Sequence, residues 1–350
     1  MKIKFPIIYA FLVIAAPAKA DINVSLDTGF AESVLTDVCS GALIDEKSIQ
    51  ASTAVKGMLS HFSQFRDYFT MDAYINARQT AANCEKSDRD IFRFNDVIDN
   101  KERLVAEVNA MKSNQKGYSG KLTSMLSAYT PKGIEYEGRA TIAVGTPSCG
   151  GWSSGDDFYV DLPCIAGDQP GLQYLFAHES YHGIQEKFMP ASVANDPLGR
   201  LLSAMMREGS ATAIADFSDL ESDGSYTVKS QQSIQKNARR IQQNFDLLEM
   251  ALVYLYENPN MTAYDVVNNI GLSGSFDAPF YAVGAVIFDT VEAHDGLGVL
   301  LCFLQQPARA IVGRYALISD KDESLPRLGL VTLKALGSNF ETEVSQCVNQ

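Results

Sequence analysis

The residues most able to do chemistry lie in the string HESYH, which begins at His178 and ends at His182. Leu172 and Leu175 precede it at helical spacing, which predicts that the string lies on a helix. Histidines four residues apart lie about one turn apart on one helical face, so both imidazoles can bind the same cation. Glu179 would project beside that cation without binding it, where it can take a proton from a metal-bound water.

The donor set favours zinc, bound as a single ion. Imidazole nitrogens and carboxylate oxygens are ordinary zinc ligands, and zinc lowers the pKa of its bound water to near neutrality. The chain has only four histidines, and two of them lie in this pentapeptide. Chance would place HExxH in roughly two of a thousand sequences of this composition, so we interpret the string as a metal site rather than as packed or surface histidines.

A catalytic zinc site normally has three protein ligands and one open position. Our candidate for the third ligand is Glu208, in the segment MMREGSATAIAD. A carboxylate on this apolar predicted helix is costly to bury unless something pairs it. Gly209 and the small residues after it would let this helix approach the first one closely. The alternative is a surface glutamate paired with Arg207 or a lysine.

Other polar residues are weaker candidates for the metal site. Glu186 lies a further turn along the helix and would overshoot an ion seated between the two histidines. Asp216 or Asp219 can accept the outer N–H of a zinc-bound histidine. We expect His294 at a helix end, where it would meet the negative end of the helix dipole, and His61 in a packing or surface role.

The first residues, MKIKFPIIYAFLVIAAPAKA, have the order of a secretory signal peptide: lysines, an apolar run and a small-residue site that ends at Ala20. The apolar run is too short for a membrane span, and no later stretch is long and apolar enough for one. We expect cleavage near Ala20 and a soluble periplasmic or secreted protein. Loss of three lysines would take the formal charge from −13 to −16, which argues against nucleic acid or anionic membrane as a partner.

Six cysteines follow this segment, and an even count in an exported chain favours disulfides over free thiols. Several connectivities are possible, and we expect sequential pairing, in which each bond is local: 39–84, 149–164 and 302–347. The alternative, a thiolate metal site, lacks any CxxC spacing.

The chain divides into three predicted regions: the signal peptide at 1–20, a helical region at 21–130 and a zinc metallopeptidase-like catalytic region at 131–350. Short β-type runs occur at 140–144 and 158–162. The helices expected in the third region cover 171–188, 197–219, 228–257, 279–294 and 327–347. The expected fold class is α+β and predominantly α, a helical scaffold with a small sheet ahead of the HExxH helix and a glutamate helix.

With HESYH and with Glu208 followed by Gly209, the chain resembles bacterial zinc-dependent peptidases of the gluzincin clan, which also holds thermolysin and the aminopeptidase-N-like enzymes. The likeness covers roughly residues 138 to 300, and HExxH is its specific part. It implies zinc-dependent hydrolysis of a peptide or protein substrate. By likeness to the aminopeptidase-N-like enzymes, the hydroxyl of Tyr281, in FYAVGA, would donate to the oxyanion. An ordinary tyrosine that fills the core is the alternative.

The chain also departs from these relatives. The GxMEN segment with which aminopeptidases hold a free amine is absent, and no NExxSD of the thermolysin type follows the zinc helix. The resemblance therefore implies the mechanism of the clan and leaves endo- or exopeptidase action open. In such enzymes an edge strand upstream of the zinc helix aligns the substrate. We expect 139–146 or 157–162 to serve, with Gly150 and Gly151 at the rim of the cleft and Trp152 either there or packed inside.

These features predict an exported zinc metallopeptidase in which Glu179 is the general base and Tyr281 stabilises the oxyanion. Two functions of other classes stay open. One is a non-catalytic peptidase-like binding protein of the cell envelope. The other is a structural helical protein in which the motif is accidental.

Overall fold

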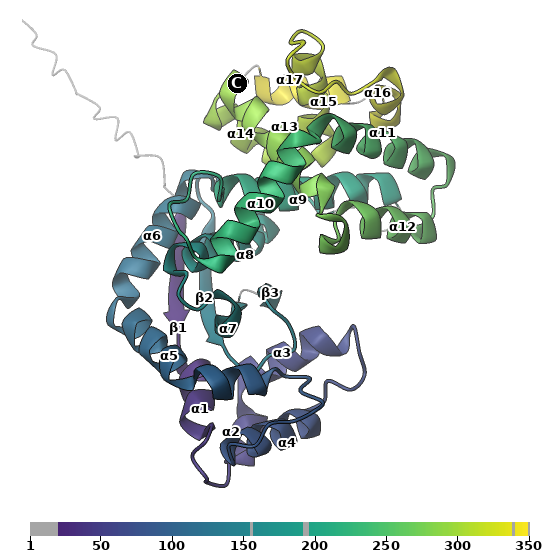
Figure 1. The fold of residues 1–350 in the computed structure, drawn as a ribbon. Coiled ribbons are helices and arrows are strands. Elements are labelled where there is room, and N and C mark those ends of the chain that lie inside the picture. Colours follow the sequence, from purple (N-terminus) through teal and green to yellow (C-terminus); the bar gives the residue numbers. More distant parts are fainter. Residues whose placement is uncertain (1–19, 155–156, 192–195, 338–339, 349–350) are drawn as a thin grey trace, which may run out of the picture.

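The computed structural model describes residues 20–154, 157–191, 196–337 and 340–348. Apart from Ala20, the expected signal peptide lies outside these residues. The fold is mainly helical with one small sheet, so the predicted α+β, predominantly α class is confirmed. Figure 1 shows the sheet and the first helices at one end of the molecule and most of the later helices at the other.

Four strands form the sheet: β1 (Asp21–Asp27), β2 (Glu135–Ala143), β3 (Gly151–Ser154) and β4 (Asp157–Asp161). Their order is β1-β2-β4-β3, with β1, β2 and β4 parallel and β3 antiparallel to β4. The prediction that 21–130 is helical is wrong for its first residues, which form β1. In DINVSLD the apolar side chains alternate with polar ones and are buried in turn, which is the period of a strand.

The expected edge strand is also corrected by the structure. Residues 139–146 lie mostly in β2 and residues 157–162 mostly in β4, and each of these strands has a neighbour on both sides. The outer strands of the sheet are β1 and β3. Of these two, β3 packs against α8 (Gln169–Phe188), the helix that carries HESYH.

Six helices lie between β1 and β2 in the chain: α1 (Gly29–Asp37), α2 (Glu46–Ala51), α3 (Thr53–Ser63), α4 (Met71–Ala82), α5 (Phe94–Ser113) and α6 (Gln115–Ala128). Helix α6 packs along β1, α1 packs on β2 and α3 contacts β3. Val24, Ile142 and Val160 from three neighbouring strands are completely buried beneath these helices and α8. Removal of this apolar surface from water is the main force that holds the sheet and its helices together.

The second half of the chain is helical: α7 (Leu162–Ile165), α9 (Pro197–Ile214), α10 (Ser225–Arg239), α11 (Ile241–Glu257), α12 (Met261–Gly271), η1 (Gly274–Phe276), α13 (Pro279–Asp295), α14 (Leu297–Leu304), α15 (Ala308–Ser319), α16 (Leu330–Leu336) and α17 (Phe340–Val348). The single helix expected at 228–257 is two helices that meet at Arg240. The helix expected at 327–347 divides at Gly337, whose φ of +82° suits glycine and ends a right-handed helix.

Helices α9 and α13 touch through their backbones. A Cβ atom placed on Gly209 would lie 2.3 Å from the carbonyl carbon of Gly284, and one on Gly284 would lie 2.4 Å from the carbonyl oxygen of Met205. Only glycine at both positions permits so close an approach. The contact therefore sets the separation of the residues beside it, Glu208 on α9 and Tyr281 on α13.

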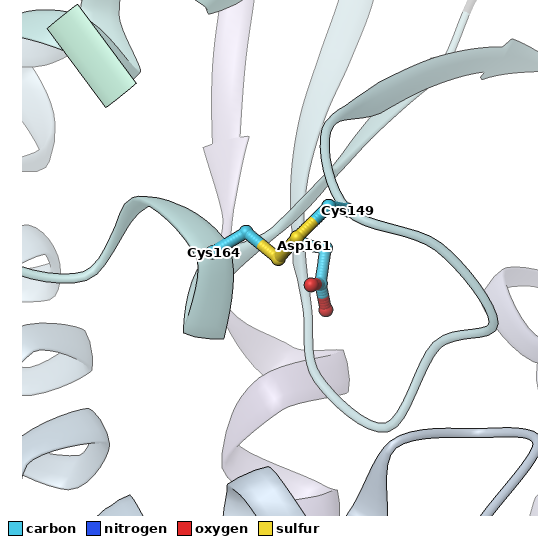
Figure 2. Close-up of side chains that lie close together, drawn as sticks. All are labelled: Cys149, Asp161 and Cys164. Carbon is cyan, nitrogen blue, oxygen red and sulfur yellow. A yellow bond between two sulfur atoms is a disulfide. The ribbon is translucent and has the colours of Figure 1, made fainter. Parts of the chain in front are cut away.

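Disulfides join Cys39 to Cys84, Cys149 to Cys164 and Cys302 to Cys347, so the sequential pairing is confirmed. The second bond ties the loop before β3 to α7, and Asp161 lies beside it (Figure 2). The two sulfurs are bonded to each other, so neither is the thiolate that a metal requires. This bond removes the alternative of a cysteine metal site at this position.

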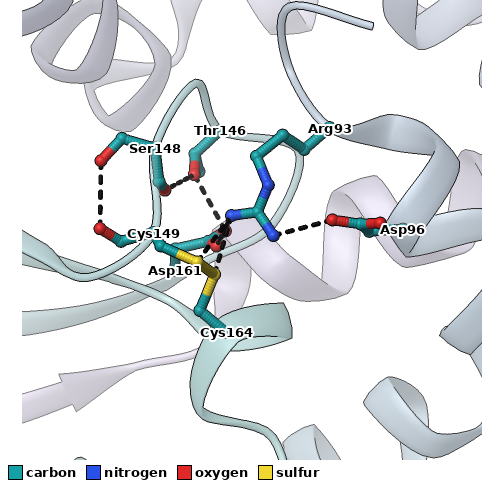
Figure 3. Close-up of a disulfide and its surroundings, with 7 residues drawn as sticks. All are labelled: Arg93, Asp96, Thr146, Ser148, Cys149, Asp161 and Cys164. Atoms are coloured by element: carbon teal, nitrogen blue, oxygen red, sulfur yellow. Dashed lines mark hydrogen bonds and ion pairs between the residues drawn. A yellow bond between two sulfur atoms is a disulfide. The ribbon is translucent and has the colours of Figure 1, made fainter. Parts of the chain in front are cut away.

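Arg93 lies beside the same disulfide (Figure 3). Its guanidinium donates to Asp161 and to Asp96, each at 2.7 Å, and one of its nitrogens lies 2.8 Å from the sulfur of Cys164. The hydroxyl of Thr146 donates to the other oxygen of Asp161 at 2.9 Å. Burial raises the pKa of Asp161 to about 7, although Arg93 and Thr146 act in the opposite direction.

The contact between α9 and α13 predicts that Gly209→Ala destabilises the protein. The new methyl group meets backbone atoms, which cannot rotate away, so the helices must separate. We expect a loss of about 1–3 kcal/mol in the free energy of unfolding, measured by denaturant titration. Gly120→Ala on α6 is the control, because a Cβ there meets nothing within 4 Å. Equal midpoints for Gly209→Ala and wild type would contradict the contact.

The pH dependence of stability tests the buried carboxyl of Asp161. Its pKa of about 7 in the folded state lies above that of an unfolded aspartate, so the folded state binds the proton more tightly. This contribution to the free energy of unfolding is complete below about pH 4 and is lost as the pH rises through the folded-state pKa.

We therefore expect Asp161→Asn to flatten the fall in unfolding free energy between about pH 4 and pH 7, measured by urea titration at each pH. Asp96→Asn removes the other carboxylate partner of Arg93 and serves as the control. An unchanged pH slope in Asp161→Asn would show that another group causes it.

Candidate metal site and adjoining cleft

Helices α8 and α9 bring three candidate ligands together at one point. His178 and His182 lie on α8, and their Nε2 atoms are 3.2 Å apart. Glu208 on α9 places its Oε2 atom 3.5 Å from Nε2 of His178 and 3.3 Å from Nε2 of His182. Glu208, which follows His182 by 26 residues in the sequence, thus lies beside both histidines.

The three separations fit a zinc ion. Tetrahedral zinc with metal–nitrogen distances of about 2.0–2.1 Å has ligand atoms roughly 3.3–3.4 Å apart. The three measured separations lie within about 0.2 Å of that range. Two imidazoles and one carboxylate also form a common catalytic zinc ligand set. The residues present can therefore hold one zinc ion and leave a fourth position open.

The ring of His182 is oriented by Gln185, one turn further along α8. The amide nitrogen of Gln185 donates to the carbonyl oxygen of Arg207 and to the hydroxyl oxygen of Ser210, each at 2.8 Å. Its amide oxygen must therefore accept from Nδ1 of His182, at 3.0 Å. Because Nδ1 is held by Gln185, Nε2 is the nitrogen that faces His178 and Glu208.

The electrostatics of the three groups are strongly coupled. Burial alone would raise the pKa of Glu208, but the two histidines hold it well below its usual range. Burial alone would lower the pKa of His182, but Glu208 raises it to about 9. A partly buried, ionised carboxylate thus faces the two imidazoles, and the site favours a positive charge between them.

Glu179 lies outside this triad and against β3. A Cβ atom on Gly151 would lie 3.0 Å from Cγ and 3.2 Å from Oε1 of Glu179. The bare glycine backbone therefore leaves room for the carboxylate at the start of the edge strand. This places a carboxylate beside the three candidate ligands, where it can exchange a proton with a bound water.

Tyr281 approaches the triad from α13. Its ring stacks on that of His178, with centroids 6.4 Å apart and an interplanar angle of 12°. Burial, followed by the charge of Glu208 and a hydrogen bond to it, raises the pKa of the phenol. The hydroxyl therefore stays protonated and can donate a hydrogen bond.

A cleft of about 880 Å³ lies over His178, Glu179 and Tyr281. One long face of α10 forms one wall, and α13 with the end of α9 forms another. Gly150 and Gly151 lie at its border, as expected. The cleft is large enough for several residues of an extended peptide.

The weaker candidates lie away from the ligand triad or make other contacts. Asp216 accepts hydrogen bonds from the backbone and the hydroxyl of Ser218 at 2.8 and 2.6 Å, so the second-layer role considered for it falls to Gln185. His294 lies in the last turn of α13, as expected, and pairs with Asp295 at 2.8 Å.

Trp152 takes the packing role left open above. It is only 4% exposed and stacks on Tyr159, with ring centroids 5.3 Å apart.

Sequence reasoning missed two features of the site. Gln185 has a readable signal, because a side chain three residues after His182 lies on the same face of the helix. The edge strand β3 is only four residues long and begins with glycine, so it has little strand signal of its own.

Comparison with protein families gives one match. Residues 47–324, more than three quarters of the chain, match the family described as "Putative zinc dependent peptidase". No curated protein and no solved structure matches the chain at a significant level. The matched range includes α8, α9 and α13, and with them all the candidate site residues. This chain belongs to that zinc-dependent peptidase family.

Proposed function

We propose that this protein is an exported peptidase of the gluzincin type, with one zinc ion held by His178, His182 and Glu208. The observation that carries the proposal is the 3.2–3.5 Å separation of the three ligand atoms. The family match supports zinc dependence and peptidase activity independently of this geometry.

The residues around the triad supply the parts of peptide hydrolysis. Zinc, when bound, polarises a water molecule and the scissile carbonyl. Glu179 accepts a proton from the water and passes it to the leaving nitrogen. The hydroxyl of Tyr281 donates a hydrogen bond to the oxyanion that develops on the carbonyl oxygen. Gln185 keeps the ring of His182 in the orientation that this requires.

The free edge of β3 is suited to align an extended substrate. The N–H of Asp161 donates to the carbonyl oxygen of Gly150 at 2.9 Å, just before the β3–β4 ladder. Hydrogen-bonding direction alternates along an antiparallel strand, so Trp152 turns its backbone groups toward β4. Gly151 and Ser153 then turn theirs outward, and no other described backbone group pairs with them. A peptide can add there as a fifth strand, with its backbone beside Glu179.

Export is supported by two observations. The three disulfides are typical of proteins outside the reducing cytosol, and the N-terminal segment has the order of a signal peptide. Within the part of the chain that the structure describes, no helix has the length and apolar character needed to cross a membrane.

Replacement of Glu179 by Gln tests the proposed general base. We expect kcat to fall by about 10²–10⁴ on a broad peptide library, with the zinc content measured by elemental analysis unchanged. Glu186→Gln is a matched control, because Glu186 is exposed on the same helix. If the Glu179→Gln protein has the same kcat as wild type, the peptidase assignment is wrong. Zinc binding without hydrolysis in wild type would instead indicate a peptidase-like binding protein.

Replacement of Tyr281 by Phe tests the oxyanion donor. The ring keeps its place beside His178, while the hydroxyl is lost. We expect kcat to fall by about 10²–10³, with KM and zinc content nearly unchanged, because the hydroxyl acts on the transition state. Tyr254→Phe, on the exposed surface of α11, is the control. An unchanged kcat in Tyr281→Phe would show that another group donates to the oxyanion. The proposed metal site would not be affected by that result.

A further inference from the structure

The edge strand β3 is covered by a different helix on each of its faces. At Gly151 the side-chain direction points to Glu179 on α8. Side chains alternate along a strand, so Trp152 points to the opposite face. There it packs on Phe62 of α3, with ring centroids 5.1 Å apart, as well as on Tyr159. The free edge of β3 thus lies between the zinc-side helix and α3.

Two aromatic side chains on and just after α3 extend this second face toward solvent, and we call them the aromatic shelf: His61 and Phe65. The ring of His61 lies 6.2 Å from that of Trp152 and 5.5 Å from that of Phe65. Phe65 is 61% exposed. Burial lowers the pKa of His61, which favours the uncharged ring beside Phe65.

The register of β3 decides which substrate side chain meets this surface. Residues directly opposite each other on paired strands project to the same face, with Cβ atoms about 5 Å apart. The substrate residue opposite Gly151 therefore projects toward Glu179 and the metal ligands. The residue opposite Trp152 projects toward α3. Figure 1 shows α3 beside β3, on the side of the sheet away from β1.

We propose that the aromatic shelf is a specificity subsite. It binds the large apolar or aromatic side chain of the substrate residue that pairs with Trp152. The inference rests on the proposed function, because it assumes that a peptide adds to β3. Contact between the exposed ring of Phe65 and an apolar substrate side chain removes both surfaces from water, and this favours binding. Backbone pairing with β3 then aligns the substrate, and the aromatic shelf selects the side chain of one substrate residue.

Hydrolysis of internally quenched peptides by the full chain tests the subsite. Each peptide carries Phe, Leu or Gly at one varied position. In wild type we expect one position at which Phe or Leu raises kcat/KM at least about tenfold over Gly. Phe65→Ser should bring that ratio close to one by raising KM for the Phe and Leu peptides, while Phe65→Trp should retain the preference.

Leu43→Ser is the matched control, because Leu43 is a 91% exposed apolar residue elsewhere among the first helices. If Phe65→Ser keeps the preference for Phe or Leu over Gly, the subsite is overturned. The same holds if Leu43→Ser lowers that preference equally. If wild type cleaves no peptide, the proposed function fails, and binding of the same peptides is measured by fluorescence anisotropy. Tighter binding of the Phe peptide that disappears in Phe65→Ser would still support the shelf, and equal binding of all peptides would overturn it.

Discussion

The site depends on one partly buried charge, the carboxylate of Glu208 between α8, α9 and α13. An ionised group in such surroundings is tolerated only when opposite charge or hydrogen-bond donors face it. His178, His182 and the hydroxyl of Tyr281 supply these partners. The same arrangement lowers the pKa of Glu208 and raises that of His182. The requirement to compensate one carboxylate therefore explains why two imidazoles and a phenol converge on it.

Two layers outside the triad maintain this geometry. Gln185 joins the ring of His182 to α9 through hydrogen bonds to Arg207 and Ser210. The backbone contact of Gly209 with Gly284 keeps α9 and α13 close enough for Glu208 and Tyr281 to meet. On the other side of the cleft, the disulfide from Cys149 ties the loop before β3 to α7. Ligand positions are thus fixed by helix packing, and the edge strand is fixed by a covalent bond.

The helices were predictable from the sequence where their apolar residues recur at a regular spacing. The helix of HESYH was expected at 171–188 and runs from Gln169 to Phe188. Strand β1 was missed although its apolar residues alternate, because the sequence does not show that it pairs with β2, more than a hundred residues further along the chain. Local patterns also placed strands near 140–144 and 158–162 but not their order. An edge is a property of the whole sheet, and β3 becomes one only through antiparallel pairing with β4.

Short-range spacing in the sequence is enough to identify two histidines one turn apart with a glutamate between them. The sequential disulfides were expected among several possible pairings, and the structure confirms them across separations of 45, 15 and 45 residues. The sequence also indicated Glu208 and Tyr281 as candidates, but spacing alone does not say which side chains meet. Only the tertiary structure decided that Glu208 and Tyr281 lie beside the histidines, that Gln185 orients His182 and that β3 borders the cleft. Apart from the local pairing of Gln185 with His182, these contacts join segments distant in sequence, and the packing of whole helices and strands sets them.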